Sequence, residues 1–358
     1  MKQFLSIFLG VLIAGSIVYG VYLLINKVES NFVSPISKLV GDKVETFQNP
    51  LTGEQVPLEK AASWRDVRPL AVMVNNYVDA RPQSGLIYAD LVYEIVAEGG
   101  ITRLLPFYLS NIPEKIGPVR STREYYLVLV KELGDAMLMH IGWSPQALEA
   151  IESWPVRSLG RGGGSFWRDN PRNVAIEHTA YVNGKDLLET GLGLGWAGTR
   201  EFEVWQYKDD KKGYENGKSA NKVVIDFWYK GDYTAAFEYD PGTNSYIRFV
   251  GYDESDNLIP HKDQETQDQI KVKNLIVQFV PEVPILGDDK NRLTYELVGA
   301  GKGYVFLDGK VIDVTWSKES RDERTMFYDT EGKEITFNRG KTWISVVPDR
   351  NVDQVVIN

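Results

Sequence analysis

The chain has 358 residues, no cysteine and a formal net charge of −9. The lack of cysteine excludes disulfides, thiol catalysis, thiolate metal sites and attachment of a lipid to a cysteine. The acidic balance argues against a general nucleic-acid binder, whose surface is basic, and against a polybasic membrane patch. We therefore expect no nucleic-acid partner.

The first strong feature is an almost unbroken apolar run from Phe4 to Ile25. It is about as long as the ~20 residues that cross a bilayer as a helix, and no small-residue cleavage pattern follows it. The run predicts a single, uncleaved transmembrane helix, with a removed signal peptide as the alternative. Lys2 before the run, and Lys27 partly offset by Glu29 after it, slightly favour an extracytoplasmic position for the large domain. We expect a single-pass protein of the cell membrane.

Strand signals begin after a polar, proline-containing spacer. Pro69–Val74 is a short apolar run typical of a buried strand. Leu91–Glu98 and Ile101–Leu109 read as two further strands, joined at Gly99 and Gly100. A two-residue glycine turn is typical of a β-hairpin.

Helix signals follow the hairpin. Apolar residues recur at helical spacing within Gly117–Gly134, and Ser121 with Glu124 fits a capping box. Ser144, followed by a proline, predicts the start of a second helix that continues to about Ser153. Alternating strands and helices predict an α/β or α+β first domain, in which helices cover a sheet.

The pattern changes at Tyr207–Lys222, a charged run that contains glycine and predicts a linker. Beyond it, short β-branched or aromatic runs alternate with turns, which predicts a β-rich, mostly antiparallel second domain. The expected division is a transmembrane anchor at 1–28, a spacer at 29–62, an α/β domain at 63–206, a linker at 207–222 and a β-rich domain at 223–358.

Several long segments resemble a known bacterial family. They are PLAVMVNNYVDARPQSGL, ADLVYEIVAEGGITRLLPFY, IGPVRSTREYYL, HIGWSPQALEAI, GKGYVFLDGKVIDVTWSK and FYDTEGKEITFNRGKTWISVVP. On these motifs, from about Pro69 to Pro348, the chain resembles the YerB-like family of bacterial membrane-attached lipoproteins. The resemblance implies a two-domain extracytoplasmic protein but no particular activity. The chain departs from the family in having an apolar anchor in place of the lipid-bearing cysteine, and Ala175–Thr179 where many relatives have Pro-His-Asn.

The first candidate site residue is Arg103. If the two glycines form a two-residue turn, Arg103 pairs across the hairpin with Val96, and Glu94 and Glu98 are its diagonal neighbours on the same face. This placement predicts an ion-pair cluster, which is either a structural salt bridge or part of a binding site.

Arg120 and Arg123 lie around the predicted first turn of a helix, where the helix dipole disfavours cations and favours an anion. Two guanidinium groups and the backbone donors of a helix start are suited to hold a phosphate or carboxylate. The alternative is that Glu124 and other carboxylates already neutralise both arginines.

The three histidines differ in their sequence context. His140 is expected at a strand-to-helix turn, a usual place for sites in α/β sheets, although a core histidine is the simpler reading. His178 follows Glu177 and lies close in sequence to Arg168, so an acid, a base and a cation are available there. His261 lies in an acidic run and is expected at the surface. No histidine spacing suits a metal ion, and we expect no metal or cofactor.

Together these residues predict a cleft in the first domain that binds an anionic envelope component or an acidic segment of a protein partner. The cleft would be lined by Arg103, Arg120, Arg123, His140, Arg168 and His178. An envelope hydrolase or transferase acting on a glycan or phosphodiester is the alternative, with His140, His178 and Glu98 as catalytic groups. A third reading is a protein-binding scaffold that uses the aromatic β-rich domain.

Overall fold

The computed structural model of the protein describes residues 45–198, 200–210 and 217–358. The apolar run Phe4–Ile25 lies outside the described residues. Within the described ranges, no helix combines the length and the apolar character needed to cross a membrane. Residues 46–358 form one compact unit.

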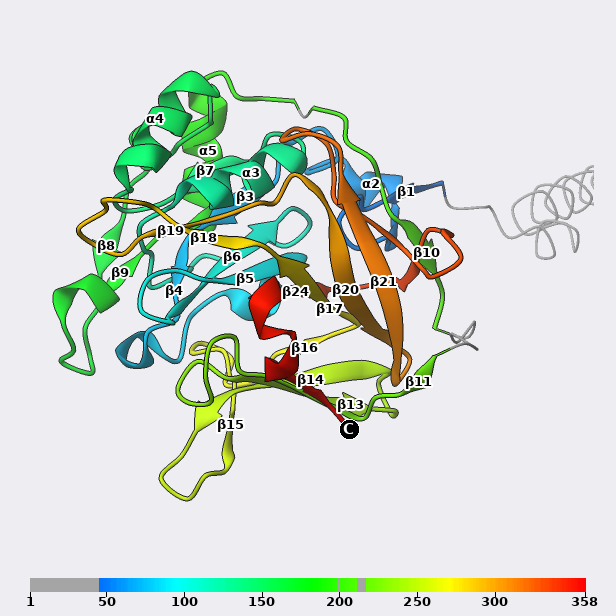
Figure 1. Cartoon of the computed structure of the whole chain (residues 1–358). Helices are drawn as coiled ribbons and strands as arrows, with labels where there is room; N and C mark the ends of the chain where they lie inside the picture. Colours follow the sequence, from blue (N-terminus) through cyan, green and yellow to red (C-terminus); the bar gives the residue numbers. More distant parts are fainter. Residues whose placement is uncertain (1–44, 199, 211–216) are drawn as a thin grey trace, which may run out of the picture. The chain divides into compact units, whose positions relative to one another are not determined.

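A mixed sheet of eleven strands forms the centre of this unit (Figure 1). Its main path runs in the order β11 (Lys218–Ser219), β21 (Lys310–Lys318), β20 (Gly299–Leu307), β17 (Asn274–Val280), β24 (Thr342–Pro348), β5 (Leu91–Val96), β6 (Thr102–Tyr108), β3 (Leu70–Val72) and β7 (Met137–Met139), with β22 (Met326–Tyr328) on β21 and β4 (Val74–Asn75) on β6. Every residue of β5, β17 and β24 is buried, as expected for strands that are covered on both faces.

The two predicted domains share this sheet. β24 pairs in parallel with β5, from Thr342 opposite Leu91 to Val346 opposite Ile95. The strands on one side of this pair come from the predicted α/β domain. Those on the other side come from the predicted β-rich domain, except β11, which lies within the predicted linker. The charged run at 207–222 therefore separates two stretches of sequence that both contribute strands to the central sheet.

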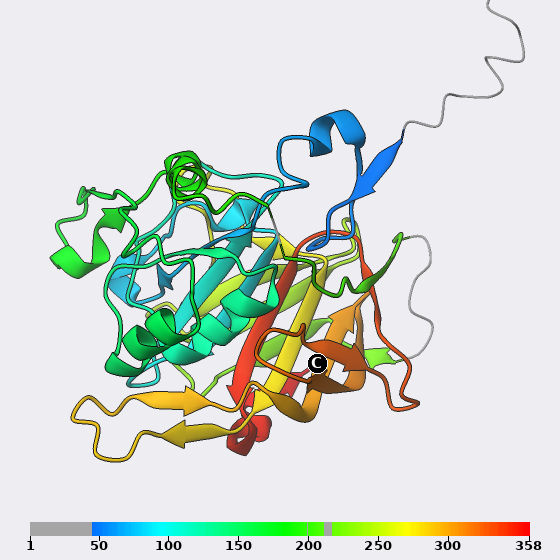
Figure 2. The ribbon, with the colours of Figure 1, turned by 90° about the horizontal axis from the view of Figure 1, so that it is seen from above.

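A second, antiparallel sheet covers one face of the central sheet (Figures 1 and 2). Its path is β15 (Leu258–Pro260), β14 (Ser245–Tyr252), β13 (Ala235–Asp240), β12 (Lys222–Ile225) and β25 (Val355–Ile357), with β16 (Lys271–Val272) on β14. Aromatic rings fill the space between the sheets: Phe237 meets Trp343 with ring centroids 6.2 Å apart, and Tyr246 meets Phe306 at 6.3 Å. The expected β-rich, mostly antiparallel character of the second half is therefore confirmed.

The three longest helices of the described residues lie over the other face, at the end of the sheet that carries β3, β6 and β7 (Figure 1). They are α3 (Glu124–Glu132), α4 (Pro145–Ser153) and α5 (Gly184–Gly193). The hydroxyl of Tyr126 on α3 donates to the carbonyl of Ile95 on β5 at 3.1 Å. α4 agrees with the prediction, since Ser144 caps it and accepts from the Ala147 N–H at 3.2 Å.

Short elements complete the fold. They are α2 (Leu58–Ala61), the 3-10 helices η1 (Val78–Ala80), η2 (Leu86–Tyr88), η3 (Ile176–His178) and η4 (Asp349–Gln354), and the strand pairs β1 (Thr46–Gln48) with β2 (Gln55–Pro57), β8 (Trp167–Arg168) with β9 (Ala180–Tyr181), β10 (Gln206–Lys208) with β23 (Thr336–Asn338), and β18 (Glu282–Pro284) with β19 (Leu293–Tyr295). The β18–β19 pair projects as an arm (Figure 2). The Tyr295 hydroxyl on this arm donates to the Val96 carbonyl at 3.0 Å, which brings the arm to the end of β5.

Candidate functional site

The β5–β6 hairpin has a different register from the predicted one. A two-residue turn would set Arg103 opposite Val96, whereas the structure sets Arg103 opposite Ile95. Both glycines of the turn have positive φ, but the loop is one residue longer. A shift of one residue moves side chains to the other face of a strand. Glu94 and Arg103 therefore lie on opposite faces of the sheet, and the predicted contact between them is wrong.

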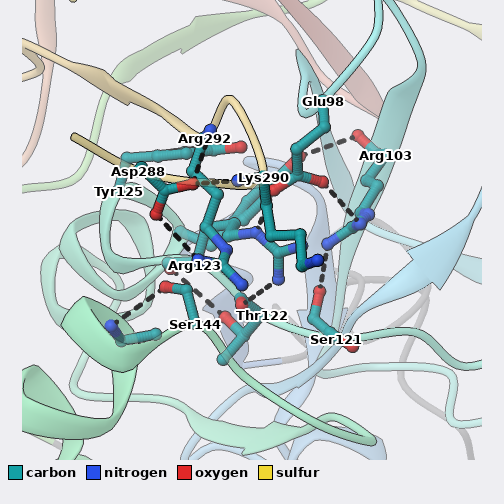
Figure 3. A network of polar contacts seen from close by, with 12 residues as sticks. Glu98, Arg103, Ser121, Thr122, Arg123, Tyr125, Ser144, Asp288, Lys290 and Arg292 are labelled. Carbon is teal, nitrogen blue, oxygen red and sulfur yellow. Dashed lines mark hydrogen bonds and ion pairs between the residues drawn. The ribbon is translucent and has the colours of Figure 1, made fainter. Parts of the chain in front are cut away.

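Glu98, at the hairpin turn, does pair with Arg103, at 3.0 Å between Oε2 and Nη2. Its other carboxylate oxygen pairs with Arg123, and Figure 3 shows both arginines directed at the one carboxylate. Both guanidinium groups also donate to carbonyls, from Arg103 to Ser121 and from Arg123 to Thr122, each at 2.8 Å. Burial opposes ionisation of Glu98, but the two arginines outweigh it and hold its pKa below the ordinary value. The guanidinium groups of Arg103 and Arg123 thus already have ion-pair and hydrogen-bond partners within the protein.

The segment before α3 is extended rather than helical. α3 begins at Glu124, with Arg123 in the N-cap position and no side-chain cap. The predicted capping box is wrong, because the Ser121 hydroxyl donates to the Ile141 carbonyl at 2.9 Å instead. The preceding residues are held by main-chain bonds, including Arg120 N–H to the Met73 carbonyl at 2.8 Å. The positive end of the helix dipole therefore lies beside Arg123 and not beside Arg120.

His140 is a core residue with 1% exposure. Its Nδ1 lies 2.9 Å from the Gly142 carbonyl and its Nε2 lies 2.7 Å from the Ser158 hydroxyl. Burial lowers its pKa to about 4. Because both ring nitrogens hold parts of the fold together, this geometry gives no support to the predicted acid–base role.

His178 has one ring nitrogen fixed by the fold. Its Nδ1 lies 2.8 Å from the side-chain Nδ2 of Asn75, whose Oδ1 accepts from the Tyr77 N–H at 2.9 Å. The Tyr77 contact orients the amide so that Nδ1 is an acceptor, and neutral His178 then carries its proton on Nε2. The Tyr77 ring stacks on the imidazole at 4.8 Å.

The electrostatic surroundings of His178 favour its neutral form. Burial is the main reason that its pKa is lowered, and the positive charges of Arg120 and Arg172 add to the effect. Glu177 and Asp79 act in the opposite direction and do not cancel it. Arg120 and His178 are therefore neighbours, although they are far apart in the sequence.

Arg120 differs from the other predicted arginines. Within the described part of the chain, its half-buried guanidinium makes no hydrogen bond or ion pair. Arg168 is exposed and donates to the Ile176 carbonyl and to the Thr179 hydroxyl, so it holds the loop that carries η3. Of the four arginines, Arg120 alone keeps its donors available for a ligand.

The sequence shows which family these residues belong to. Residues 51–196 match "Protein of unknown function (DUF3048) N-terminal domain" and residues 223–344 match the C-terminal domain of the same family. The chain belongs to the DUF3048 family. A similar protein of Bacillus subtilis (strain 168), named "Putative lipoprotein YerB", is 32% identical over 316 residues, which are 87% of this chain and 89% of that protein. The crystal structure of YerB from Bacillus subtilis, at 30% identity, matches with a TM-score of 0.73 and covers 87% of this chain and 99% of that one.

The two DUF3048 segments meet at the ion pairs of Glu98 with Arg103 and Arg123. The loop between β18 and β19, which belongs to the C-terminal segment, carries Asp288, Lys290 and Arg292, and Figure 3 shows these side chains beside Arg123. Asp288 pairs with Arg292 at 2.7 Å. Sequence reasoning missed this loop, because nothing local indicates that residue 290 lies near residue 123. It also missed Asn75, although two asparagines at the end of an apolar strand are a polar signal.

His261 and the cavities of the protein differ from the predictions. His261 was expected at the surface but is 2% exposed, because its segment packs against another loop, where His261 Nε2 lies 2.8 Å from the Gln83 side-chain oxygen. Cavities of about 550, 390 and 300 Å³ lie in the protein, and none of these three is lined by a predicted site residue. In residues 45–198, 200–210 and 217–358, no cluster of His, Cys, Asp and Glu is suited to a metal ion.

Proposed function

We propose that this protein is a membrane-anchored, extracytoplasmic binding protein of the cell envelope that recognises an anionic ligand through Arg120 and His178. The observation that carries the proposal is the unpartnered guanidinium of Arg120 beside a histidine whose proton is directed to Nε2. Cationic and neutral N–H donors side by side favour a carboxylate or phosphate oxygen.

The surroundings of these two residues favour an acidic segment of a partner protein over a small ion. Exposed apolar side chains lie on the two segments that meet at His178, namely Tyr77 and Val78 on one segment and Ile176, at 65% exposure, on the other. Protein interfaces combine such apolar contacts with arginine anchors. A peptide that carries glutamates next to apolar residues would satisfy both.

The enzyme alternative receives less support from the same geometry. An acid–base role for His140 would require one ring nitrogen to be available, and both are used. His178 has an amide rather than a carboxylate as its hydrogen-bond partner, and the charges of Glu177 and Asp79 do not bring its pKa back to the ordinary value, so the imidazolium that a general base forms is disfavoured.

The membrane attachment rests on the apolar run Phe4–Ile25 and on the word lipoprotein in the name of the Bacillus relative. Because this chain has no cysteine to carry a lipid, the run itself would be the anchor. The full chain should therefore stay with the membrane fraction after carbonate extraction. Recovery of a processed, freely soluble product would contradict the anchor.

The binding site can be tested with His178 as its own reporter, because the chain has only three histidines. In a nuclear magnetic resonance titration, a glutamate- and leucine-containing peptide should raise the pKa of His178. Arg120→Ala should itself raise that pKa, because a neighbouring positive charge is lost, and it should weaken peptide binding by about 1.5–3 kcal/mol, the range for a hydrogen bond to a charged group.

Arg123→Ala is the matched control, since this arginine is engaged with Glu98. It should leave both the pKa of His178 and the peptide affinity unchanged. Equal losses of affinity in the two variants, or a peptide that leaves the His178 signals unchanged, would show that the proposed site is not the binding site.

A further inference from the structure

A second cationic site lies where two central strands of the sheet, β17 and β24, begin, and nothing in the proposed function uses it. A cavity of about 390 Å³ opens where β17 and β24 begin, and its lining contains four cations and one carboxylate. The cations are Lys271, Lys273, Arg339 and Lys341, and the carboxylate is Glu54. The chain as a whole has more acidic than basic residues, so this concentration of positive charge is not a general property of its surface.

Main-chain hydrogen bonds place these cations close to one another. Lys273 and Lys341 are the residues directly before β17 and β24, and the N–H groups of Lys273 and Asn274 both donate to the Lys341 carbonyl, at 2.9 and 3.2 Å. Two cationic pairs with alternate spacing, Lys271 with Lys273 and Arg339 with Lys341, therefore lie on neighbouring segments. Like charges at this spacing repel each other unless an anion lies between them.

The carboxylates nearby do not balance the cations fully. Lys273 pairs with Asp210 at 2.5 Å, and Arg339 pairs with Asp209 at 2.8 Å. Lys341 donates only to a main-chain carbonyl, that of Ile87, and burial lowers its pKa in spite of nearby acids. Lys271 is exposed and forms no ion pair with any described residue, although its charge helps to lower the pKa of Asp240. Two lysines of the cavity thus form no ion pair with a described carboxylate.

A glycine keeps the cavity in this form. Gly340 has φ of +129°, and a Cβ added there would lie 2.6 Å from Cγ of Lys273. The Lys273 side chain therefore crosses directly over the main chain between the two other basic residues. Only glycine leaves room for this path.

We propose that this cavity binds a phosphate group. A tetrahedral phosphate has several oxygens and up to two charges, so it can accept from one guanidinium and several ammonium groups at once. The cavity volume also leaves space for a substituent on the phosphate. The same chemistry is offered by free inorganic phosphate and by the phosphodiester groups of an anionic envelope polymer.

The test uses the full chain in detergent, with inorganic phosphate and a glycerol-phosphate polymer as separate probes at constant ionic strength. Calorimetric titration should detect phosphate binding that chloride does not compete away, and Lys271→Gln should weaken it about tenfold, as expected for one lost charge-assisted hydrogen bond. Lys271 is exposed, so this variant keeps the fold. Lys230→Gln, which removes an exposed lysine paired with Asp256, is the control and should leave the affinity unchanged.

The outcomes separate the two ligand sources and the two sites. Tight polymer binding with weak phosphate binding identifies a phosphodiester polymer, and the reverse identifies free phosphate. Arg120→Ala should retain the phosphate site, so failure of the proposed peptide site leaves this inference standing. Absence of binding by both probes, or equal affinities for Lys271→Gln and the parent chain, would overturn it.

Discussion

Charged side chains near the central sheet differ in whether they have a partner of opposite charge. On one face, Glu94 forms an ion pair with Arg248 at 2.8 Å, and both side chains are completely buried. At the edge of the helical region, Arg120 is half-buried and has no carboxylate partner among the described residues. The difference teaches that the fully buried Glu94 carboxylate already has a cation as its partner within the protein, whereas the half-buried guanidinium of Arg120 is left for a ligand to pair with.

The Glu94 carboxylate has other donors besides Arg248. One carboxylate oxygen accepts from Arg248 and from the Trp343 indole N–H at 3.0 Å, and the other accepts from the Thr102 hydroxyl at 2.9 Å. Trp343 also lies under the Arg248 guanidinium, 4.2 Å from ring centroid to Cζ. The network joins the central sheet to the six-stranded sheet, so it fixes how the two sheets pack.

Breaking this network should give the largest effect. Arg248→Met should lower the free energy of unfolding by about 3–5 kcal/mol, because it leaves the Glu94 carboxylate buried without its cation. Urea unfolding followed by the fluorescence of the nine tryptophans measures the loss. Adding Glu94→Gln to the variant should recover part of the stability, since the unpaired charge is then removed. A double variant no more stable than the single one would contradict this account.

The next effect depends on pH and concerns His140. Its pKa is about 4 in the folded protein against an ordinary 6.5, so between these values the unfolded chain binds more protons. The free energy of unfolding contributed by neutral His140 is fully present above pH 6.5 and falls by about 3 kcal/mol as the pH decreases to 4. Asp90, whose pKa burial raises to about 6, acts with the opposite sign.

His140→Gln separates the two groups, because Asp90 is unchanged in the variant. The variant should be less stable than the parent chain at pH 7, and the difference between them should shrink by about 3 kcal/mol by pH 4. Urea unfolding at several pH values measures the difference. Parallel pH profiles would show that His140 does not titrate as its burial implies.

Much of the local structure is predictable from the sequence. α4 was predictable because Ser144 and Pro145 give a complete start signal, and the β-rich second half was predictable from its turns and β-branched runs. The hairpin was recognised, but its register was not, since one extra loop residue changes which side chains share a face.

The candidate site was predictable only where its contacts are local. Glu98 and Arg103 lie five residues apart and were expected to pair. Glu94 pairs with Arg248, and His178 pairs with Asn75. In both cases the two residues are far apart in the sequence, and no periodic pattern connects them. The order of strands in the central sheet decides those contacts, and it depends on packing rather than on any local signal.

The smallest effect on stability should come from Arg120, and it tests the contrast between the paired Glu94 and the unpaired Arg120 most directly. Arg120→Ala removes no hydrogen bond or ion pair with a described residue, so the free energy of unfolding should change by no more than about 0.5 kcal/mol. Arg123→Ala should cost about 1.5 kcal/mol, because Glu98 loses one charged partner and keeps only Arg103. Urea unfolding of both variants under one set of conditions compares them. If Arg120→Ala proved the more destabilising of the two, Arg120 would have a structural role, and its availability for an anionic ligand would no longer follow.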